Sequence, residues 1–95
     1  MHGSDKYKIE YLSLVIKKDI FVLSKSVALR IKRTIEEKLT HAPHIFGKPL
    51  RQSLKGSRSL RVGDYRVIYL IEKKTVLIVI IQHRSVVYKE IKDRF

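Results

Sequence analysis

The stretch "YRVIYLIEKKTVLIVIIQ", residues 65–82, decides the fold because it holds two apolar segments separated by a short polar break. The residues on both sides of that break are mostly β-branched and aromatic, which favours strands. A connection as short as Glu72-Lys73-Lys74 requires the two strands to pair antiparallel. The second segment, 75–82, is apolar at almost every position, which predicts an interior strand covered on both faces.

A third strand, 58–62, precedes this hairpin and is joined to it by a two-residue turn at Gly63-Asp64. With the hairpin turned at 72–74, residue i lies roughly opposite residue 146 − i. Arg66 is then expected near Ile80, one diagonal step from Gln82 and His83. On a period of two, Arg66 shares its face with Ile68 and Leu70.

The N-terminal half predicts one strand and two helices. Residues 7–12 alternate between apolar and polar, which is typical of an edge strand. Ser13 is expected to cap a short helix, and a second helix is expected at 27–39 with an apolar residue at every fourth position. Apolar residues of the first helix are Ile16, Ile20 and Leu23, and those of the second are Val27, Ile31, Ile35 and Leu39. The pair is expected to form a helical hairpin.

Residues 41–57 contain both prolines and predict a loop, while 85–95 predict a short terminal helix. The expected fold class is therefore α+β: a small antiparallel sheet with an N-terminal helical hairpin packed on one face, in the order β-α-α-β-β-β-α. Ninety-five residues predict a single domain spanning 1–95. Residues 1–6 are expected to be disordered or a cloning remnant.

The charge indicates an anionic partner, because 21 Lys and Arg against 9 Asp and Glu give a net charge of +12. Nucleic acid and an acidic protein both satisfy this requirement. The chain has no cysteine, so disulfides and thiolate metal sites are excluded. Its longest apolar run, 76–81, is far shorter than the ~20 residues of a membrane helix. A cytoplasmic protein is expected.

Familiar catalytic motifs are absent from the sequence. It has neither a phosphate-binding glycine loop nor a GxGxxG motif. The four histidines lack acidic or cysteine companions at ligand spacing, so no metal and no cofactor are expected. Glu36-Glu37 lies on the polar face of a predicted helix, where pairing with basic neighbours explains it. Any chemistry must therefore come from Arg, Lys, His and Tyr.

These residue types suffice to cleave RNA by attack of the 2′-hydroxyl on the adjacent phosphate. That reaction needs a base, cations for the charge that builds on phosphorus, and an acid for the departing 5′-oxygen. Arginine suits the second role because its planar fork holds two phosphate oxygens. Histidine suits either proton role, and tyrosine can act as a base if nearby cations lower its pKa. Taken singly, His83 is better explained as a strand-end residue and Tyr88 as a residue that packs a helix on the sheet; it is their combination with Arg66 and the excess of positive charge that favours a functional cluster.

From Pro49 to Tyr88 the chain resembles the RelE branch of the RelE/ParE toxin superfamily, the toxins of type II toxin–antitoxin modules. The motifs are "LKG", "LRVGDYRVIY" and the closing "HRSVVY". The resemblance implies an endoribonuclease that cuts messenger RNA on the ribosome without a metal and is silenced by a protein antitoxin. An acidic, partly disordered antitoxin is expected to wrap the basic sheet.

The resemblance also implies roles for individual residues. Arg66 is similar to the strand arginine that holds the phosphate, and Tyr88 to the terminal tyrosine proposed as general base. Arg84 and His83 stand where relatives place residues that donate the leaving-group proton and stabilise charge. Arg61 is expected to contact the substrate.

Two departures leave alternatives open. Relatives present two lysines on the strand before the glycine turn, where this chain has Ser57 and Ser59; Lys55 or Arg58 is expected to substitute in substrate binding. Because the ParE branch shares the fold, one alternative is a toxin that inhibits DNA gyrase. Another is a catalytically weak RelE-fold protein that only binds nucleic acid or antitoxin.

Overall fold

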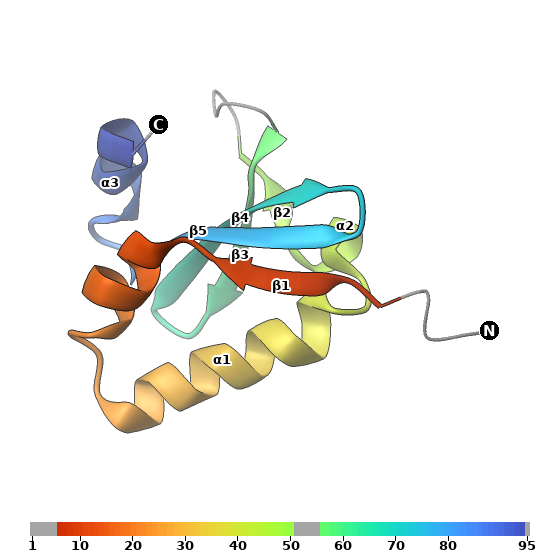
Figure 1. Cartoon of the computed structure of the whole chain (residues 1–95). Helices are drawn as coiled ribbons and strands as arrows, with labels where there is room; N and C mark the ends of the chain where they lie inside the picture. The colour runs from red at the N-terminus through yellow and green to blue at the C-terminus, as the bar shows by residue number, and fades with distance from the viewer. Residues whose placement is uncertain (1–5, 51–55, 95) are drawn as a thin grey trace.

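The computed structural model describes residues 6–50 and 56–94 (Figure 1). In chain order its elements are β1 (Lys8–Tyr11), the π-helix η2 (Val15–Ile20), α1 (Lys25–Leu39), α2 (Pro43–Phe46), β2 (Lys48–Pro49), β3 (Arg58–Val62), β4 (Tyr65–Glu72), β5 (Thr75–His83) and α3 (Val87–Arg94). Within the described ranges, no helix has the length and apolarity needed to cross a membrane.

The five strands form one sheet in the order β1-β5-β4-β3-β2. The predicted α+β class is confirmed, and so is the interior position of β5, which lies between β1 and β4. One detail of the prediction is wrong, because β1 pairs parallel with β5 and the sheet is mixed. The long connection from β1 through η2 and α1 carries the chain back across one face, and this makes a parallel pairing possible.

The predicted register of the β4–β5 hairpin is also wrong by two residues. Arg66 lies opposite Gln82, whereas Ile80 pairs with Ile68. One residue of this shift arises because the turn contains only Lys73 and Lys74, whereas the predicted turn also contained Glu72. Lys73 has a φ of 55°. The other residue of the shift arises from a β-bulge, since Ile68 pairs with Ile80 while the next residue pairs with Ile78.

The bulge matters because it determines which residues of β5 pack into each of the two cores. Val79 and Ile80 are consecutive, yet both belong to the cluster on the α3 face, together with Ile68 and Val87. The opposite face packs against α1 and forms the larger core, whose buried members are Val15, Ile31, Ile35, Leu39, Leu60, Val62, Val67, Tyr69, Val76, Ile78 and Ile81. Figure 1 shows α1 lying across this face of the sheet.

The first helical segment differs most from expectation. It is a π-helix that buries Val15 and Asp19, whereas Ile16 is exposed and the Ser13 side chain does not cap it. Helix α1 agrees better with the prediction, because Ile31, Ile35 and Leu39 are buried. It begins two residues early, with the hydroxyl of Ser24 accepting a hydrogen bond from the Val27 amide at 3.3 Å.

The predicted loop at 41–57 contains the short helix α2 and the two-residue strand β2. Both elements are held by tertiary contacts. The Tyr69 hydroxyl donates a hydrogen bond to the Pro43 carbonyl at 2.8 Å, and β2 pairs with β3. Gly47 joins them in close contact with the Tyr69 ring, and a Cβ at this position would collide with that hydroxyl. The backbone of Gly47 has a φ of −89°, which alanine also adopts, so the glycine is required by space.

Replacing Gly47 with alanine is therefore expected to lower the free energy of unfolding by about 1–3 kcal/mol, the usual cost of overpacking. Urea unfolding monitored by circular dichroism measures the change as a lower midpoint with an unchanged slope. A variant as stable as the parent would show that the α2–β2 segment does not pack on Tyr69.

Candidate functional site: a basic cleft on the α3 face

A cleft of about 670 Å³ opens on the sheet face that carries α3. Its described lining comes from β2, β3, β4, α3 and the end of α2: Phe46, Lys48, Pro49, Leu50, Ser59, Arg61, Arg66 and Tyr88. This lining contains three cations and no carboxylate. Cross-strand partners point to the same face of a sheet, and the pairs Arg61–Arg66 and Lys48–Ser59 gather these side chains.

The charge of the cleft is not neutralised within the described chain. Arg66 donates through Nη1 to the carbonyls of Tyr65 at 3.1 Å and Gly63 at 3.2 Å, which are uncharged partners. Among the described residues, Lys48, Arg61 and Arg66 make no ion pair. Like charges held together raise the potential in a concave site and attract an anion.

The structure brings three of the predicted residues, Arg61, Arg66 and Tyr88, into this one cleft. Tyr88 is 65% exposed and extends from the first turn of α3. Lys48 and Phe46 also line the cleft, and the sequence analysis missed both. Their part of the chain resembles an irregular loop in sequence, and it becomes ordered through contacts with Tyr69 and β3.

His83 and Arg84 do not line the cleft. His83 pairs with Tyr65 in the register, its ring packs edge-on against that of Tyr65 at 5.5 Å, and its Nδ1 lies 2.9 Å from the Ser85 hydroxyl. Since adjacent residues of a strand alternate faces, His83 and Gln82, the partner of Arg66, point in opposite directions. The Arg84 side chain is 64% exposed and lies 3.8 Å from the carboxylate of Asp64.

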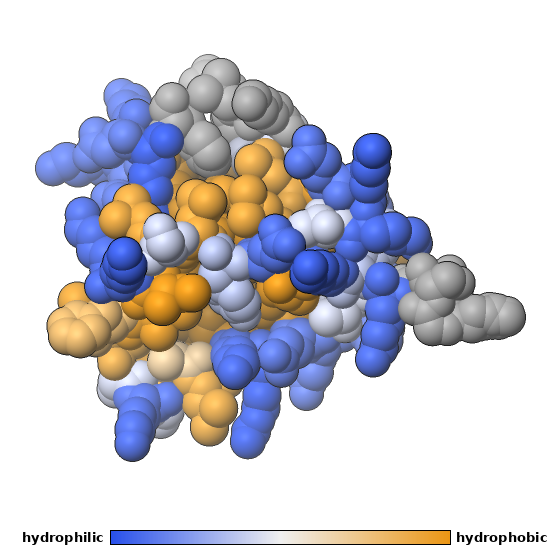
Figure 2. Space-filling model, in the orientation of Figure 1, coloured by the Kyte–Doolittle hydropathy of each residue, from blue (hydrophilic) through white to orange (hydrophobic). Residues whose placement is uncertain are grey.

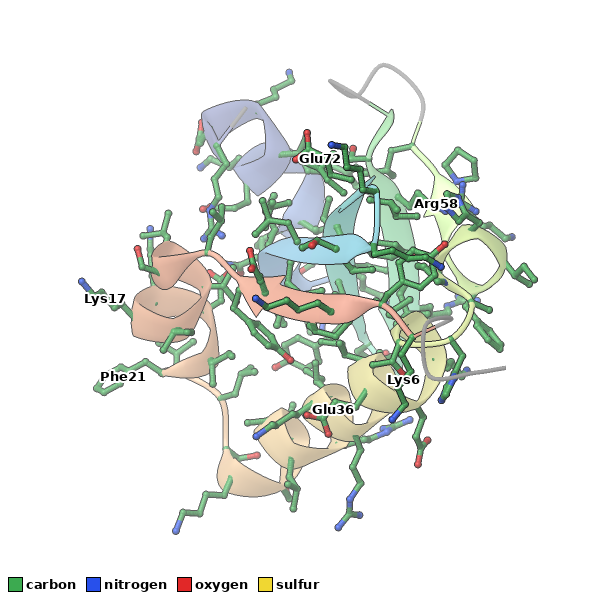
Figure 3. All side chains as sticks on the ribbon, turned by 45° about the vertical axis from the view of Figure 1, so that its right-hand side comes forward. Lys6, Lys17, Phe21, Glu36, Arg58 and Glu72 are labelled. Atoms are coloured by element: carbon green, nitrogen blue, oxygen red, sulfur yellow. The ribbon has the colours of Figure 1, made fainter. Side chains whose placement is uncertain are left out.

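Arg58 lies away from the cleft and binds backbone carbonyls. Its Nη2 donates to the His44 carbonyl at 2.8 Å and also to the Gly47 carbonyl. Figure 3 shows Arg58 beside the α2–β2 segment. Burial raises the pKa of Tyr69 and outweighs the opposing effect of the nearby Arg58 guanidinium. Lys55, the other expected substrate contact, lies outside the described residues.

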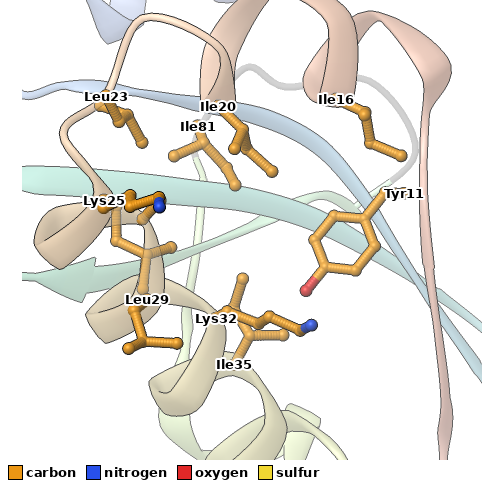
Figure 4. A pocket seen from close by; sticks show the side chains of 11 residues that line it. Tyr11, Ile16, Ile20, Leu23, Lys25, Leu29, Lys32, Ile35 and Ile81 are labelled. Carbon is orange, nitrogen blue, oxygen red and sulfur yellow. The ribbon is translucent and has the colours of Figure 1, made fainter.

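A second hollow of different character lies on the opposite face, between η2 and α1 (Figure 4). This apolar groove has a volume of about 480 Å³, and Ile16, Ile20, Leu23, Leu29 and Ile35 contribute to its walls. Figure 2 shows apolar side chains gathered over the η2 side of the molecule among hydrophilic ones. Phe21, at the end of η2, is 82% exposed and projects outward in Figure 3.

Two polar groups enter the apolar groove. The Tyr11 hydroxyl is buried and has no hydrogen-bond partner among the described residues. Burial, followed by the nearby charge of Glu36, raises its pKa. Figure 4 shows this hydroxyl and the Lys32 ammonium group directed into the same space. An unpaired buried hydroxyl costs free energy, so the groove favours a ligand that supplies an acceptor.

Comparison with known proteins gives a consistent result. A family model described as the ParE toxin of the type II toxin–antitoxin system, parDE, matches residues 12–88. The chain is 38% identical over 74 residues to Toxin RelE of Mycobacterium tuberculosis (strain ATCC 25618 / H37Rv), covering 76% of each protein. It is 43% identical over 53 residues to Toxin RelG of the same strain, covering 54% of this chain and 61% of that protein.

Solved structures show the same fold. The toxin–antitoxin complex RelBE2 from Mycobacterium tuberculosis contains a chain that matches with a TM-score of 0.76 at 29% identity, covering 84% of this chain and 93% of that one. A mutant of the E. coli toxin RelE in the free state matches with a TM-score of 0.70 at 22% identity, covering 95% and 98% of the two chains.

Arg58 and Arg61 lie in different environments, so replacing each with alanine is expected to change the free energy of unfolding by different amounts. Arg58→Ala removes the donor that holds two backbone carbonyls and is expected to lower the free energy of unfolding by about 1–3 kcal/mol. Arg61→Ala, on the same strand but exposed to the cleft, is the matched control and is expected to change it by less than about 0.5 kcal/mol. Equal losses in parallel urea titrations would contradict the structural role of Arg58.

Proposed function

We propose that this chain, which belongs to the RelE branch of the RelE/ParE superfamily of type II toxin–antitoxin toxins, is an endoribonuclease that cleaves messenger RNA on the ribosome. The observation that carries the proposal is the cleft in which Arg61, Arg66 and Lys48 have no counter-ion among the described residues and lie in the same lining as the exposed Tyr88. Such a site suits a phosphodiester, because each cation gains a partner when the substrate binds.

The proposed reaction forms a bond between the 2′-oxygen and phosphorus and breaks the bond from phosphorus to the 5′-oxygen. The phenolate form of Tyr88 accepts the proton of the 2′-hydroxyl and becomes the phenol, while Arg66 holds the non-bridging oxygens and stabilises the charge that develops on them. The departing 5′-oxygen takes its proton from Lys48, a cation of the cleft that can release one, as arginine cannot. The products are a 2′,3′-cyclic phosphate and a 5′-hydroxyl, and these steps call for no metal.

Two further features of the cleft support an RNA substrate. Phe46 belongs to the lining, and its ring, whose centroid lies 5.2 Å from the Lys38 ammonium nitrogen, offers a surface on which an unstacked base can pack. Arg84 is held by an exposed ion pair of the kind worth about 0–1 kcal/mol, so a bound phosphate can draw it from Asp64. Arg84, which does not line the cleft, is thus proposed as a fourth cation that joins Lys48, Arg61 and Arg66 when substrate binds. Neither alternative function is favoured by the comparisons.

We also propose a protein antitoxin as partner, docked in the apolar groove on the α1 side. Relatives of this chain were solved as complexes of RelE with RelB. The groove would take the apolar face of an antitoxin helix, and Lys25 and Lys32 at its walls favour acidic residues beside that face. An acceptor on the helix would satisfy the Tyr11 hydroxyl.

Substitution of either Arg66 or Tyr88 in the cleft is expected to reduce the cleavage rate strongly. Arg66→Ala should lower the cleavage rate of ribosome-bound messenger RNA by about 10²–10³-fold, the cost of one transition-state donor. Tyr88→Phe should lower it by about 10²–10⁴-fold, the usual contribution of a general base. Mapping of transcript ends after induction and growth curves measure both effects.

His83→Gln is the matched control for these variants. It changes a polar residue of the same strand end that faces away from the cleft, so the cleavage rate is expected to stay within about threefold of the parent. Cleavage that survives both Arg66→Ala and Tyr88→Phe, or that disappears with His83→Gln, would contradict the proposed site.

A charge placed in the apolar groove is expected to prevent antitoxin binding. Leu29→Glu puts a carboxylate where an acidic helix would dock and should weaken binding by at least about 30-fold, the loss typical of a central contact. Val86→Glu changes an exposed apolar residue on the α3 side and serves as control. Calorimetric titration with the proposed protein antitoxin measures the affinity of both variants. Equal affinities would place the docking surface elsewhere.

A further inference from the structure

Asp19 is the one carboxylate in the described chain that is almost completely buried, with 1% of its surface exposed. It projects from η2 and receives a bidentate ion pair from Arg94, with Nη2–Oδ1 at 2.6 Å and Nη1–Oδ2 at 2.8 Å. It also accepts hydrogen bonds from the Ile81 amide and the Gln82 side chain, both at 2.9 Å. The carboxylate therefore joins η2, β5 and α3.

The position of this hydrogen-bond network is explained by the point at which β1 stops pairing with β5. Strand β1 pairs with β5 as far as Ile78 and then turns into η2, so the edge of β5 loses its neighbouring strand at that point. Beyond it, the Ile81 amide binds Asp19 and the Val79 carbonyl accepts from Arg94 at 2.7 Å. The ion pair thus replaces the missing strand as partner of the backbone, as buried peptide groups require.

Helix α3 depends on this network because its other anchors are few. It has eight residues, whereas isolated helices shorter than about 12 residues are marginal in water. Val87 is buried and Ile91 partly buried against the sheet, and Arg94 reaches the same side from the last turn. Burial lowers the pKa of the Arg94 guanidinium, but its bonds to Asp19 and Glu90 more than offset this and raise the pKa above its ordinary value.

Both proposed catalytic residues are supported from this one carboxylate. Arg94 closes the helix whose first turn carries Tyr88, and Gln82 is the cross-strand partner of Arg66. We propose that Asp19 and Arg94 are positioning residues, which fix α3 so that Tyr88 stays in the lining of the cleft that also holds Arg66. This inference rests on the proposed function for its catalytic consequence, but the placement of α3 is testable without activity.

Arg94→Lys is the informative variant. It retains the positive charge beside the buried carboxylate, so the fold is kept, but a single ammonium group cannot reproduce the bidentate fork and the bond to Val79. Glu90→Gln is the matched control, because Glu90 also bonds Arg94, at 2.8 Å, but lies on the same helix. Should Arg94→Lys fail to fold, the double variant Asp19→Asn with Arg94→Gln is used in its place. This double variant removes both charges together.

Placement is measured first, by amide hydrogen exchange and by ¹⁹F NMR of the fluorotyrosine-labelled chain, with the Tyr88 signal assigned through Tyr88→Phe. In Arg94→Lys, exchange in α3 should rise about tenfold while α1 and β4 are unchanged. The Tyr88 signal should move toward that of free fluorotyrosine. Glu90→Gln should resemble the parent. Unchanged α3 exchange and an unchanged Tyr88 signal in Arg94→Lys would overturn the proposal.

The catalytic consequence is measured second, with kcat and KM separated on ribosome-bound messenger RNA. Arg94→Lys should lower kcat by about tenfold to 100-fold, as expected when a reacting group is misplaced, and leave KM within about threefold. An equal fall of kcat in Glu90→Gln would overturn the positioning role. If the parent protein cleaves no RNA, but Arg94→Lys still shows the expected changes in exchange and in the ¹⁹F signal, the proposed nuclease activity is rejected. The role of Asp19 and Arg94 in anchoring α3 is then retained.

Discussion

The arrangement of this molecule depends on a carboxylate buried at the point where the sheet loses its edge strand. Removing a charge from water costs several kcal/mol, and the ion pair and four hydrogen bonds of Asp19 offset this cost. Those bonds come from β5 and from the last turn of α3. The chain therefore cannot bury Asp19 without docking α3, and docking α3 builds one wall of the cleft.

The cleft itself works against stability. Lys48, Arg61 and Arg66 share a lining that contains no carboxylate among the residues that the structure describes, and they repel one another in a chain whose net charge is +12. The strands tolerate this because they are buried on the other face, where Val67 and Tyr69 are fully covered. A site that is unfavourable when empty gains more from an anion than a neutral one would.

Much of the fold was predictable because the β4–β5 hairpin and α1 follow from local periodicity, and Arg66 could be assigned to a face from alternation alone. The predictions that were wrong concern segments in which tertiary contacts override the local sequence pattern. A π-helix forms around buried Asp19, and the bulge at Val79 shifts the register beyond any estimate from turn length. Lys48 was missed for the same reason, since two residues form β2 only by pairing with β3.

The two hollows lie on opposite faces, yet η2 is connected to both: it lines the apolar groove and is joined through Asp19 to α3, which carries Tyr88 of the cleft. Ile16 and Ile20 line the apolar groove, while Asp19, next to Ile20, holds α3. A ligand that fills the groove and leaves η2 in place does not alter the cleft. A ligand that displaces η2 must also loosen Asp19 from Arg94, and linkage then requires substrate in the cleft to weaken that ligand by the same factor. The size of the effect is limited by the free energy of the Asp19 network, because a ligand shifts an equilibrium only by its difference in affinity for the two states.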